Sequence, residues 1–312
     1  MPPSAVVLGE ALIDLLEQPD GSFRPAVGGA PLNVAAGLAR LGTPTRLVSG
    51  VGTDPFATTV LGLLTSAGVA LTDVTEAPGP TPLAVASFQG AEPSFSFYGD
   101  LPIPQLDPVT VAEAAVLYCG SIALLTPFVE VARAAWAIPG PQRVFDPNLR
   151  PFLLGSAGVD GVRAIVEEFV ATADLLKLSD ADARLLYPDL SPVSAALRLR
   201  SLGARTVVLT LGAAGAVLVR PDRGARPSAF AATSIHYTDT VIGMPAHPGP
   251  VVDTTGCGDS VAAALMHRMA SGLPDEDQAW ISALQFALRV AAHVAARPGG
   301  AVAMPSLADV SP

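Results

Sequence analysis

The chain has 312 residues, of which 50% are hydrophobic, so it can bury a large core and does not have the composition of a disordered protein. Its 18 basic and 28 acidic residues give a formal charge of −10, which argues against a nucleic-acid or an anionic-membrane partner. Cys119 and Cys257 are its only cysteines, which excludes a disulfide framework and a cysteine-based zinc site.

The N-terminal segment does not resemble a secretory leader. It lacks a basic start, and Glu10 and Asp14 interrupt its apolar run. The longest uncharged stretch, 55–72, contains Thr, Ser, Gly and Pro residues and predicts a helix and a turn, not a membrane span. Together with the low cysteine content, this predicts a cytoplasmic protein.

Apolar strand-like runs alternate with helical runs along most of the chain. In chain order we expect a strand at 5–9 that 11–16 continues, a helix at 31–41, a strand at 46–51, a helix at 55–66, strands at 115–119, 143–145, 174–178 and 206–211, helices between them at 128–137, 159–172, 180–187 and 193–202, and final helices at 260–270 and 276–296. This order predicts an α/β fold with a mainly parallel sheet covered by helices on both faces.

Two segments lack a crossover helix and predict a small β lid on a single domain that spans 1–312. The lid segments are about 17–27 and 82–100, and the second alternates apolar and polar residues around a turn, as in a hairpin. Phe95, Phe97 and Tyr98 on this lid could close over a substrate, or could pack between the lid and the body or between two subunits.

The most informative motif is Asp253-Thr-Thr-Gly-Cys-Gly-Asp259, which directly precedes a helical run. The glycines flanking Cys257 allow successive amide groups to point into one space, where the helix dipole adds positive potential. Asp259 would place a proton-accepting carboxylate beside this anion hole. The alternative is a glycine-rich turn with Asp259 as a helix cap.

Five segments together resemble the ribokinase-like (PfkB) carbohydrate kinases, and within that family the bacterial fructokinases. They are Gly9-Glu-Ala-Leu-Ile-Asp14, Gly28-Gly-Ala-Pro-Leu-Asn-Val-Ala35, Asp146-Pro-Asn-Leu-Arg150, Lys177-Leu-Ser-Asp180 and 253–259. The resemblance implies a three-layer α/β/α domain, ATP and Mg²⁺ as cofactors, and transfer of the γ-phosphate to a sugar hydroxyl. It makes Asp259 the base and assigns the amides of Gly256, Cys257 and Gly258 to the transferred group, an arrangement suited to phosphoryl transfer.

The resemblance also assigns a sugar site to Asp14, Gly28, Gly29 and Asn33, and makes Asn148, Arg150 and Phe97 plausible contacts to the substrate. Tight turns at the glycines and after 143–145, a capping role for Asn33 and an exposed Arg150 are the alternatives. Fructose is the first candidate substrate, with 2-keto-3-deoxygluconate or ribose as alternatives. An acidic sugar would need cations, for which Arg150 and Arg24 are available.

The resemblance also implies which residues contact the nucleotide. Thr210, Gly212 and Gly215 match the nucleotide loop of the family, although a hairpin turn would use the same residues. Lys177 would be a nearby cation free to meet a phosphate, or else a solvated lysine. The base would lie in an apolar slot formed by 284–296 and 297–301.

The metal positions depart from the family pattern. Many members carry an Asn-x-x-Glu element that organises magnesium, whereas this chain has Ser179 and Asp182. Asp182 would bind Mg²⁺ through water, or else would form a capping box with Ser179. Asp253 and Thr255 lie where some members bind K⁺, close to Gly300 in the predicted site.

Competing functions explain fewer of these residues. A dinucleotide-dependent dehydrogenase needs Gly-x-Gly-x-x-Gly, and the nearest match, from Gly50, has Pro55 at the third glycine. A sugar-binding protein without catalysis would leave the anion hole without a purpose. Cys257 as a nucleophile is disfavoured because the resemblance assigns its position a backbone role. The four histidines, His236, His247, His267 and His293, lie away from the motifs. A homodimer through the lid is plausible for this family.

Overall fold

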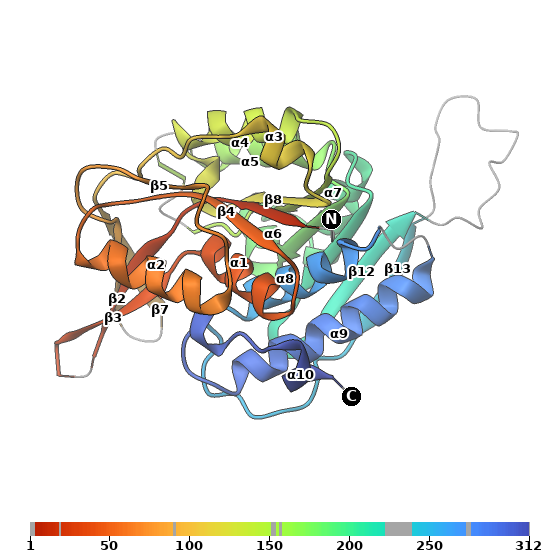
Figure 1. Cartoon of the computed structure of the whole chain (residues 1–312). Coiled ribbons are helices and arrows are strands. Elements are labelled where there is room, and N and C mark those ends of the chain that lie inside the picture. Colours follow the sequence, from red (N-terminus) through yellow and green to blue (C-terminus); the bar gives the residue numbers. More distant parts are fainter. Residues whose placement is uncertain are drawn as a thin grey trace, which may run out of the picture.

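The computed structural model describes residues 4–18, 20–89, 92–150, 154–155, 158–221, 239–272 and 276–311. Within these ranges the larger of two sheets is mainly parallel, and its antiparallel pairs lie at one edge (Figure 1). Its strand order is β13 (Asp239–Met244), β12 (Ala216–Pro221), β11 (Thr206–Thr210), β10 (Leu175–Ser179), β9 (Gln142–Asp146), β8 (Val116–Gly120), β1 (Ala5–Leu8), β4 (Thr45–Val51) and β5 (Val74–Glu76). The predicted mainly parallel sheet is confirmed.

Helices cover both faces of this sheet and create two separate hydrophobic clusters. Side chains alternate along β1, so that Ala5 and Val7 belong to one cluster and Val6 and Leu8 to the other. The first cluster includes α1 (Ala30–Arg40), α2 (Pro55–Ala67), α8 (Cys257–Met269), α9 (Asp277–Ala295) and α10 (Leu307–Val310). The second includes α3 (Pro108–Ala112), α4 (Phe128–Ala137), α5 (Gly158–Val170), α6 (Asp180–Leu186) and α7 (Pro192–Ser201). The result is the expected three-layer α/β/α fold.

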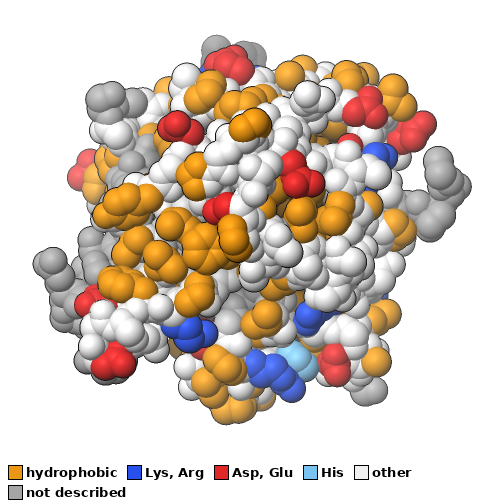
Figure 2. Space-filling model, turned by 60° about the vertical axis from the view of Figure 1, so that its left-hand side comes forward, with side chains coloured by type: hydrophobic (Ala, Val, Ile, Leu, Met, Phe, Trp, Pro, Cys, Tyr) orange, Lys and Arg blue, Asp and Glu red, His pale blue; other side chains and the backbone are white. Residues whose placement is uncertain are grey.

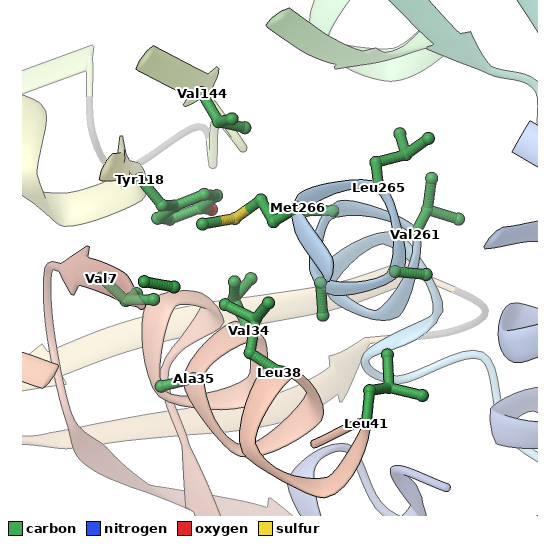
Figure 3. Close-up of a cluster of buried hydrophobic side chains, with 14 of the residues drawn as sticks. Val7, Val34, Ala35, Leu38, Leu41, Tyr118, Val144, Val261, Leu265 and Met266 are labelled. Atoms are coloured by element: carbon green, nitrogen blue, oxygen red, sulfur yellow. The ribbon is translucent and has the colours of Figure 1, made fainter. Parts of the chain in front are cut away.

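The contact between α1 and α8 holds the motifs of the first and last parts of the chain together. Val34 and Leu38 of α1 lie close to α8, while Met266 of α8 points toward Tyr118 of β8 (Figure 3). Gly37 permits this close approach of the two helices. A Cβ atom at residue 37 would lie only 2.9 Å from Ala263 Cβ, which is too close for two carbon atoms. Two distant segments are thereby fixed side by side beneath the site.

The smaller sheet has the strand order β3 (Phe23–Gly28), β2 (Leu12–Glu17), β6 (Leu83–Gln89) and β7 (Glu92–Tyr98). The expected hairpin is present, since β6 and β7 pair antiparallel. The prediction that 11–16 continues the first strand is wrong: β2 leaves the larger sheet and pairs with β3 and β6, so the small sheet begins at residue 12 and not near 17. Alternation of side chains cannot show which sheet a strand joins, because both sheets impose the same period.

Helix ends follow local signals, with one difference that matters for the site. The helix expected at 260–270 begins earlier, at Cys257, directly after Gly256. Gly256 has φ 78°, a left-handed conformation that favours glycine, and a Cβ atom there would lie 2.9 Å from Gly300 Cα. The motif glycines therefore belong to the helix start itself, where amide groups lack partners within the helix.

The face shown in Figure 2 carries its Lys and Arg side chains in small, separate groups. This one face therefore does not provide the basic footprint that a polyphosphate backbone requires. None of the helices in the described ranges combines the length and apolar character needed to cross a bilayer.

The second cluster offers a test of the packing. Phe169 is 1% exposed, and its ring centroid lies 5.2 Å from those of both Trp136 and Phe145. We expect Phe169→Ala to lower the free energy of unfolding by about 3–5 kcal/mol because it leaves a cavity. Val109→Ala is the control, since Val109 is 60% exposed and its loss should change stability by less than about 0.5 kcal/mol. Urea unfolding measures both, and equal effects would contradict this description of the core.

Candidate active site

Asp259 lies in the first turn of α8 and is held by two asparagines from distant segments. Asn33 Nδ2 of α1 donates to Asp259 Oδ2 at 2.7 Å, and Asn148 Nδ2 donates to Asp259 Oδ1 at 3.3 Å. All three residues are buried, at 6–7% exposure. Asn33 and Asn148 were predicted to contact the sugar. The structure shows that both orient the carboxylate expected to be the base.

The environment makes Asp259 a stronger base than an exposed aspartate. Burial raises the pKa of Asp259, while the hydrogen bond from Asn33, the charges of Lys177 and Arg150 and the hydrogen bond from Asn148 act against that rise. Desolvation disfavours the charged form, and donors and cations favour it. The carboxylate is thus buried, oriented and of increased proton affinity, which are the properties that general-base catalysis needs.

Fewer amide groups near Asp259 are free to bind an anion than the sequence predicts. The Cys257 amide donates to Thr254 O at 3.2 Å, so it is already engaged. Among the described hydrogen bonds, none uses the amides of Gly256 or Gly258. The prediction that three successive amides face one anion therefore needs correction for Cys257. Burial also raises the pKa of the Cys257 thiol to about 11, which disfavours a thiolate nucleophile.

Lys177 is not the free cation that the sequence predicts. It is 3% exposed, and its Nζ lies 3.0 Å from Oδ2 of Asp146, which is fully buried. The register of the two strands explains the pair: Leu176 is opposite Phe145, so the next residues of β10 and β9 are neighbours. The ammonium also lies 3.0 Å from the place that a Cβ atom on Gly258 would occupy.

At the predicted sugar end, Gly28 makes room for an acidic side chain and Gly29 makes room for a backbone carbonyl group. A Cβ atom on Gly28 would lie 2.0 Å from Asp14 Oδ2, and one on Gly29 would lie 2.6 Å from the Glu10 carbonyl oxygen. Burial raises the pKa of Asp14 to about 6, although Arg150 acts against it. Asp14 also interacts electrostatically with Asp259, so the structure brings the predicted sugar ligand and the predicted base to one site.

Arg150 supports the base through Asn148. Its Nη1 donates to Asn148 Oδ1 at 2.7 Å and to the Leu149 carbonyl at 3.0 Å. Asn148 has φ 40°, a left-handed conformation that asparagine tolerates better than most residues. Asp146 is the last residue of β9, and the described residues 147–150 form neither a turn, a helix nor a strand, so the turn alternative is not confirmed. Asn148 instead has a contact in the site.

The lid aromatics are placed unequally. Phe97 is half-buried and packs against the second hydrophobic cluster, which supports the packing alternative, whereas Tyr98 is 58% exposed. The side chain of Phe95 lies outside the described residues, as does His236. Of the other histidines, His267 contacts Thr43 at 2.8 Å and does not hydrogen-bond to the group around Asp259 among the described contacts.

Glu10 is a buried residue of the site to which the sequence analysis gave no role. It is 3% exposed, and its Oε1 accepts hydrogen bonds from Ser121 Oγ at 2.9 Å and from the Ala30 amide at 3.2 Å. Burial raises its pKa to about 7. Glu10 therefore joins the end of β1, the start of α1 and the segment after β8. A carboxylate directly after a buried strand was the available signal.

The predicted nucleotide loop has the geometry of a hairpin turn. Leu211 donates to the Gly215 carbonyl at 2.8 Å, and Thr210 is the last residue of β11, which pairs antiparallel with β12. Gly212 and Gly215 have φ 55° and 95°, so both use the conformational freedom of glycine. The turn is thus confirmed, while nucleotide contact by the same residues stays a prediction.

The expected metal residues are engaged within the protein. Asp182 forms a capping box with Ser179 and accepts from the Leu149 amide at 2.7 Å, so both of its oxygens have donors. Asp253 accepts from the Thr255 amide at 2.8 Å and from the Gly299 amide at 2.9 Å. Among the described residues, no group of three or more His, Cys, Asp or Glu side chains could hold a metal ion. The capping-box alternative is confirmed.

The chain is similar to known proteins over nearly its whole length. Residues 3–307 match the pfkB family carbohydrate kinase profile. The fructokinase of Klebsiella pneumoniae is 30% identical over 318 residues, which cover 97% of each chain, and that of Escherichia coli is 29% identical over 317 residues, which cover 96% of this chain and 95% of that one. A fructokinase from Xylella fastidiosa, solved with bound ATP, has a TM-score of 0.84 and 25% identity, with 99% of this chain and 97% of that chain covered.

This chain therefore belongs to the pfkB family of carbohydrate kinases, as its motifs indicated. It is a sugar phosphotransferase with the ribokinase-like fold.

The close approach at Gly28 can be tested directly. Gly28→Ala places a methyl group where Asp14 Oδ2 lies, so we expect kcat/KM for the sugar to fall by about 10- to 100-fold through displacement of the carboxylate. Gly62→Ala is the matched control, because a Cβ atom at Gly62 in α2 meets nothing within 4 Å. Steady-state kinetics with both variants decide the matter; an unchanged kcat/KM in Gly28→Ala would contradict the assignment of Asp14.

Proposed function

We propose that this kinase is an ATP-dependent fructokinase that converts D-fructose and ATP to fructose 6-phosphate and ADP. The observation that carries the proposal is the buried carboxylate of Asp259, held by Asn33 and Asn148 at the start of α8. The fructokinases of K. pneumoniae and E. coli, similar over nearly the whole chain, support the choice of sugar.

In the proposed reaction, the sugar hydroxyl oxygen forms a bond to the γ-phosphorus of ATP as the bond from that phosphorus to the ADP oxygen breaks. Asp259 accepts the hydroxyl proton. The amides of Gly256 and Gly258, at the positive end of α8, stabilise charge on the transferred group. Asn33 and Asn148 keep the carboxylate in line with the hydroxyl, and Asp14 accepts hydrogen bonds from other sugar hydroxyls.

Magnesium is assigned no protein ligand in this proposal. Both oxygens of Asp182 already have donors, so its side chain does not fit the expected metal role. When bound, Mg²⁺ neutralises phosphate charge, and in kinases it binds largely through substrate phosphates and water. Likewise, the carboxylate of Asp253 is committed to two amides, and K⁺ binding near Asp253 and Thr255 stays a prediction.

A neutral sugar suits the charges of the site better than an acidic one. Asp14 and Asp259 both contribute negative charge, and they interact with each other. Arg150, the cation beside them, already donates to Asn148 and Leu149. Arg24, in the exposed part of β3, is the other cation considered for a sugar acid. A carboxylate-bearing substrate would therefore meet like charge unless Arg150 left its present partners.

Two further expectations stay predictions. The small sheet exposes Phe23 at 45% and Tyr98 at 58%, which fits a dimer through the lid, and sedimentation analysis of the purified protein tests it. A cytoplasmic location rests on the sequence arguments alone.

The role of Asp259 is tested by Asp259→Asn. We expect kcat to fall by at least about 100-fold, because asparagine cannot accept the proton, while fructose binding by calorimetry changes little. Asp160→Asn is the control, since the Asp160 side chain is 91% exposed. Retained turnover in Asp259→Asn would contradict the mechanism, and a wild-type protein that binds fructose without releasing ADP would indicate a binding protein.

Substrate choice is tested with a panel of fructose, 2-keto-3-deoxygluconate and ribose, with ATP and Mg²⁺. We expect fructose to give the highest kcat/KM, because the two carboxylates disfavour an acidic sugar. ADP release measures the rates. A higher kcat/KM with 2-keto-3-deoxygluconate would overturn the fructose assignment and leave the kinase mechanism standing.

A further inference from the structure

Lys177 and Asp146 form a buried ion pair directly beneath the start of α8. Lys177 is 3% exposed and Asp146 is 0% exposed, and Nζ lies 3.0 Å from Asp146 Oδ2. The same Nζ lies 3.0 Å from the place of a Cβ atom on Gly258, the residue before Asp259. Glycine at 258 thus allows an ammonium group to approach the backbone of the anion hole from inside the protein.

The pair is difficult to explain by stability alone. Removal of two charges from water costs several kcal/mol per ion, and well-packed apolar residues often replace such pairs without loss. Burial raises the pKa of Asp146 even though Lys177 acts against it. Burial also opposes the charge of Lys177, but the carboxylates of Asp146, Asp182 and Asp259 outweigh it, so the lysine pKa lies above its usual value. Lys177 therefore stays charged and interacts with more than one carboxylate.

Charged groups face Asp259 from several elements, and most of them are acidic. The acidic groups are Glu10 after β1, Asp14 on β2 and Asp146 at the end of β9; the basic groups are Lys177 on β10 and Arg150; the neutral titratable groups are Tyr118 on β8 and Cys257. Arg150 is exposed to solvent, whereas Lys177 is enclosed, where charge interactions are less screened. Among the residues that the structure describes around Asp259, Lys177 is thus the enclosed cation that offsets these acidic groups.

We propose that Lys177, held in place by Asp146, is a positioning residue that keeps Asp259 ionised and supports the first turn of α8. It acts through Asp259 and Gly258 and does not itself contact the substrate. The inference rests on the proposed role of Asp259 as the base. It assigns the Asp146-Pro-Asn and Lys177 motifs to one electrostatic unit behind the reacting atoms.

The first test is the pH profile of Lys177→Met. Without the ammonium, the proton affinity of Asp259 rises, so we expect the acid limb of kcat/KM to move upward by about one pH unit or more. A merely structural role for Lys177 would lower activity at every pH and leave this limb in place. An unmoved limb overturns the proposal.

A companion variant keeps the test decisive if Lys177→Met folds poorly. The double variant Asp146→Asn with Lys177→Met buries no unpaired charge of this pair. We expect it to regain thermal stability relative to Lys177→Met and yet keep an acid limb above that of wild type. If the acid limb of the double variant lies at the wild-type pH, Lys177 acts only as the partner of Asp146, and the proposal is overturned.

Asp259→Asn, measured in parallel, separates the two possible failures. If that variant retains turnover, Asp259 is not the base and the proposed function fails. If it loses turnover while the limb in Lys177→Met does not move, only the inference about Lys177 fails.

Discussion

Asp259 is a carboxylate largely removed from water, and burial of this kind is costly unless donors and opposite charge surround it. Its partners are Asn33 on α1, Asn148 in the segment after β9, and Lys177 on β10. Each partner comes from a different element, so the position of Asp259 depends on the packing of the whole α/β/α body. The same burial gives the carboxylate the raised proton affinity that suits a base for an alcohol.

The glycines of the site serve close approach more than flexibility. Gly28 leaves space for Asp14, Gly258 for Lys177, and Gly300 for Asn33, whose Nδ2 lies 3.0 Å from the place of a Cβ atom there. In each case a polar side chain occupies the volume that a larger residue would fill. The motifs thus have glycine at positions where a polar side chain lies close to the backbone.

Local sequence signals predicted local structure well. The alternation of strands and helices predicted the layered body, Ser179 and Asp182 form the capping box that their spacing allows, and the hairpin of β6 and β7 lies where its alternation placed it. The membership of β2 in the smaller sheet did not follow from its alternation, because neither its period nor its composition names the neighbouring strand. Likewise, the start of α8 at Cys257 depends on a left-handed Gly256 packed against Gly300.

The sequence by itself determined the kinase family and the layered architecture, because contiguous motifs and short periods carry both, and it predicted Asp259 as the carboxylate of the candidate site. Only the tertiary structure decided what surrounds that carboxylate. It turned Asn33 and Asn148 toward Asp259, paired Lys177 with Asp146, and joined Glu10 to Ser121. These contacts link residues that lie far apart in the chain. The sequence alone does not show which distant side chains meet, because that depends on how the whole fold packs.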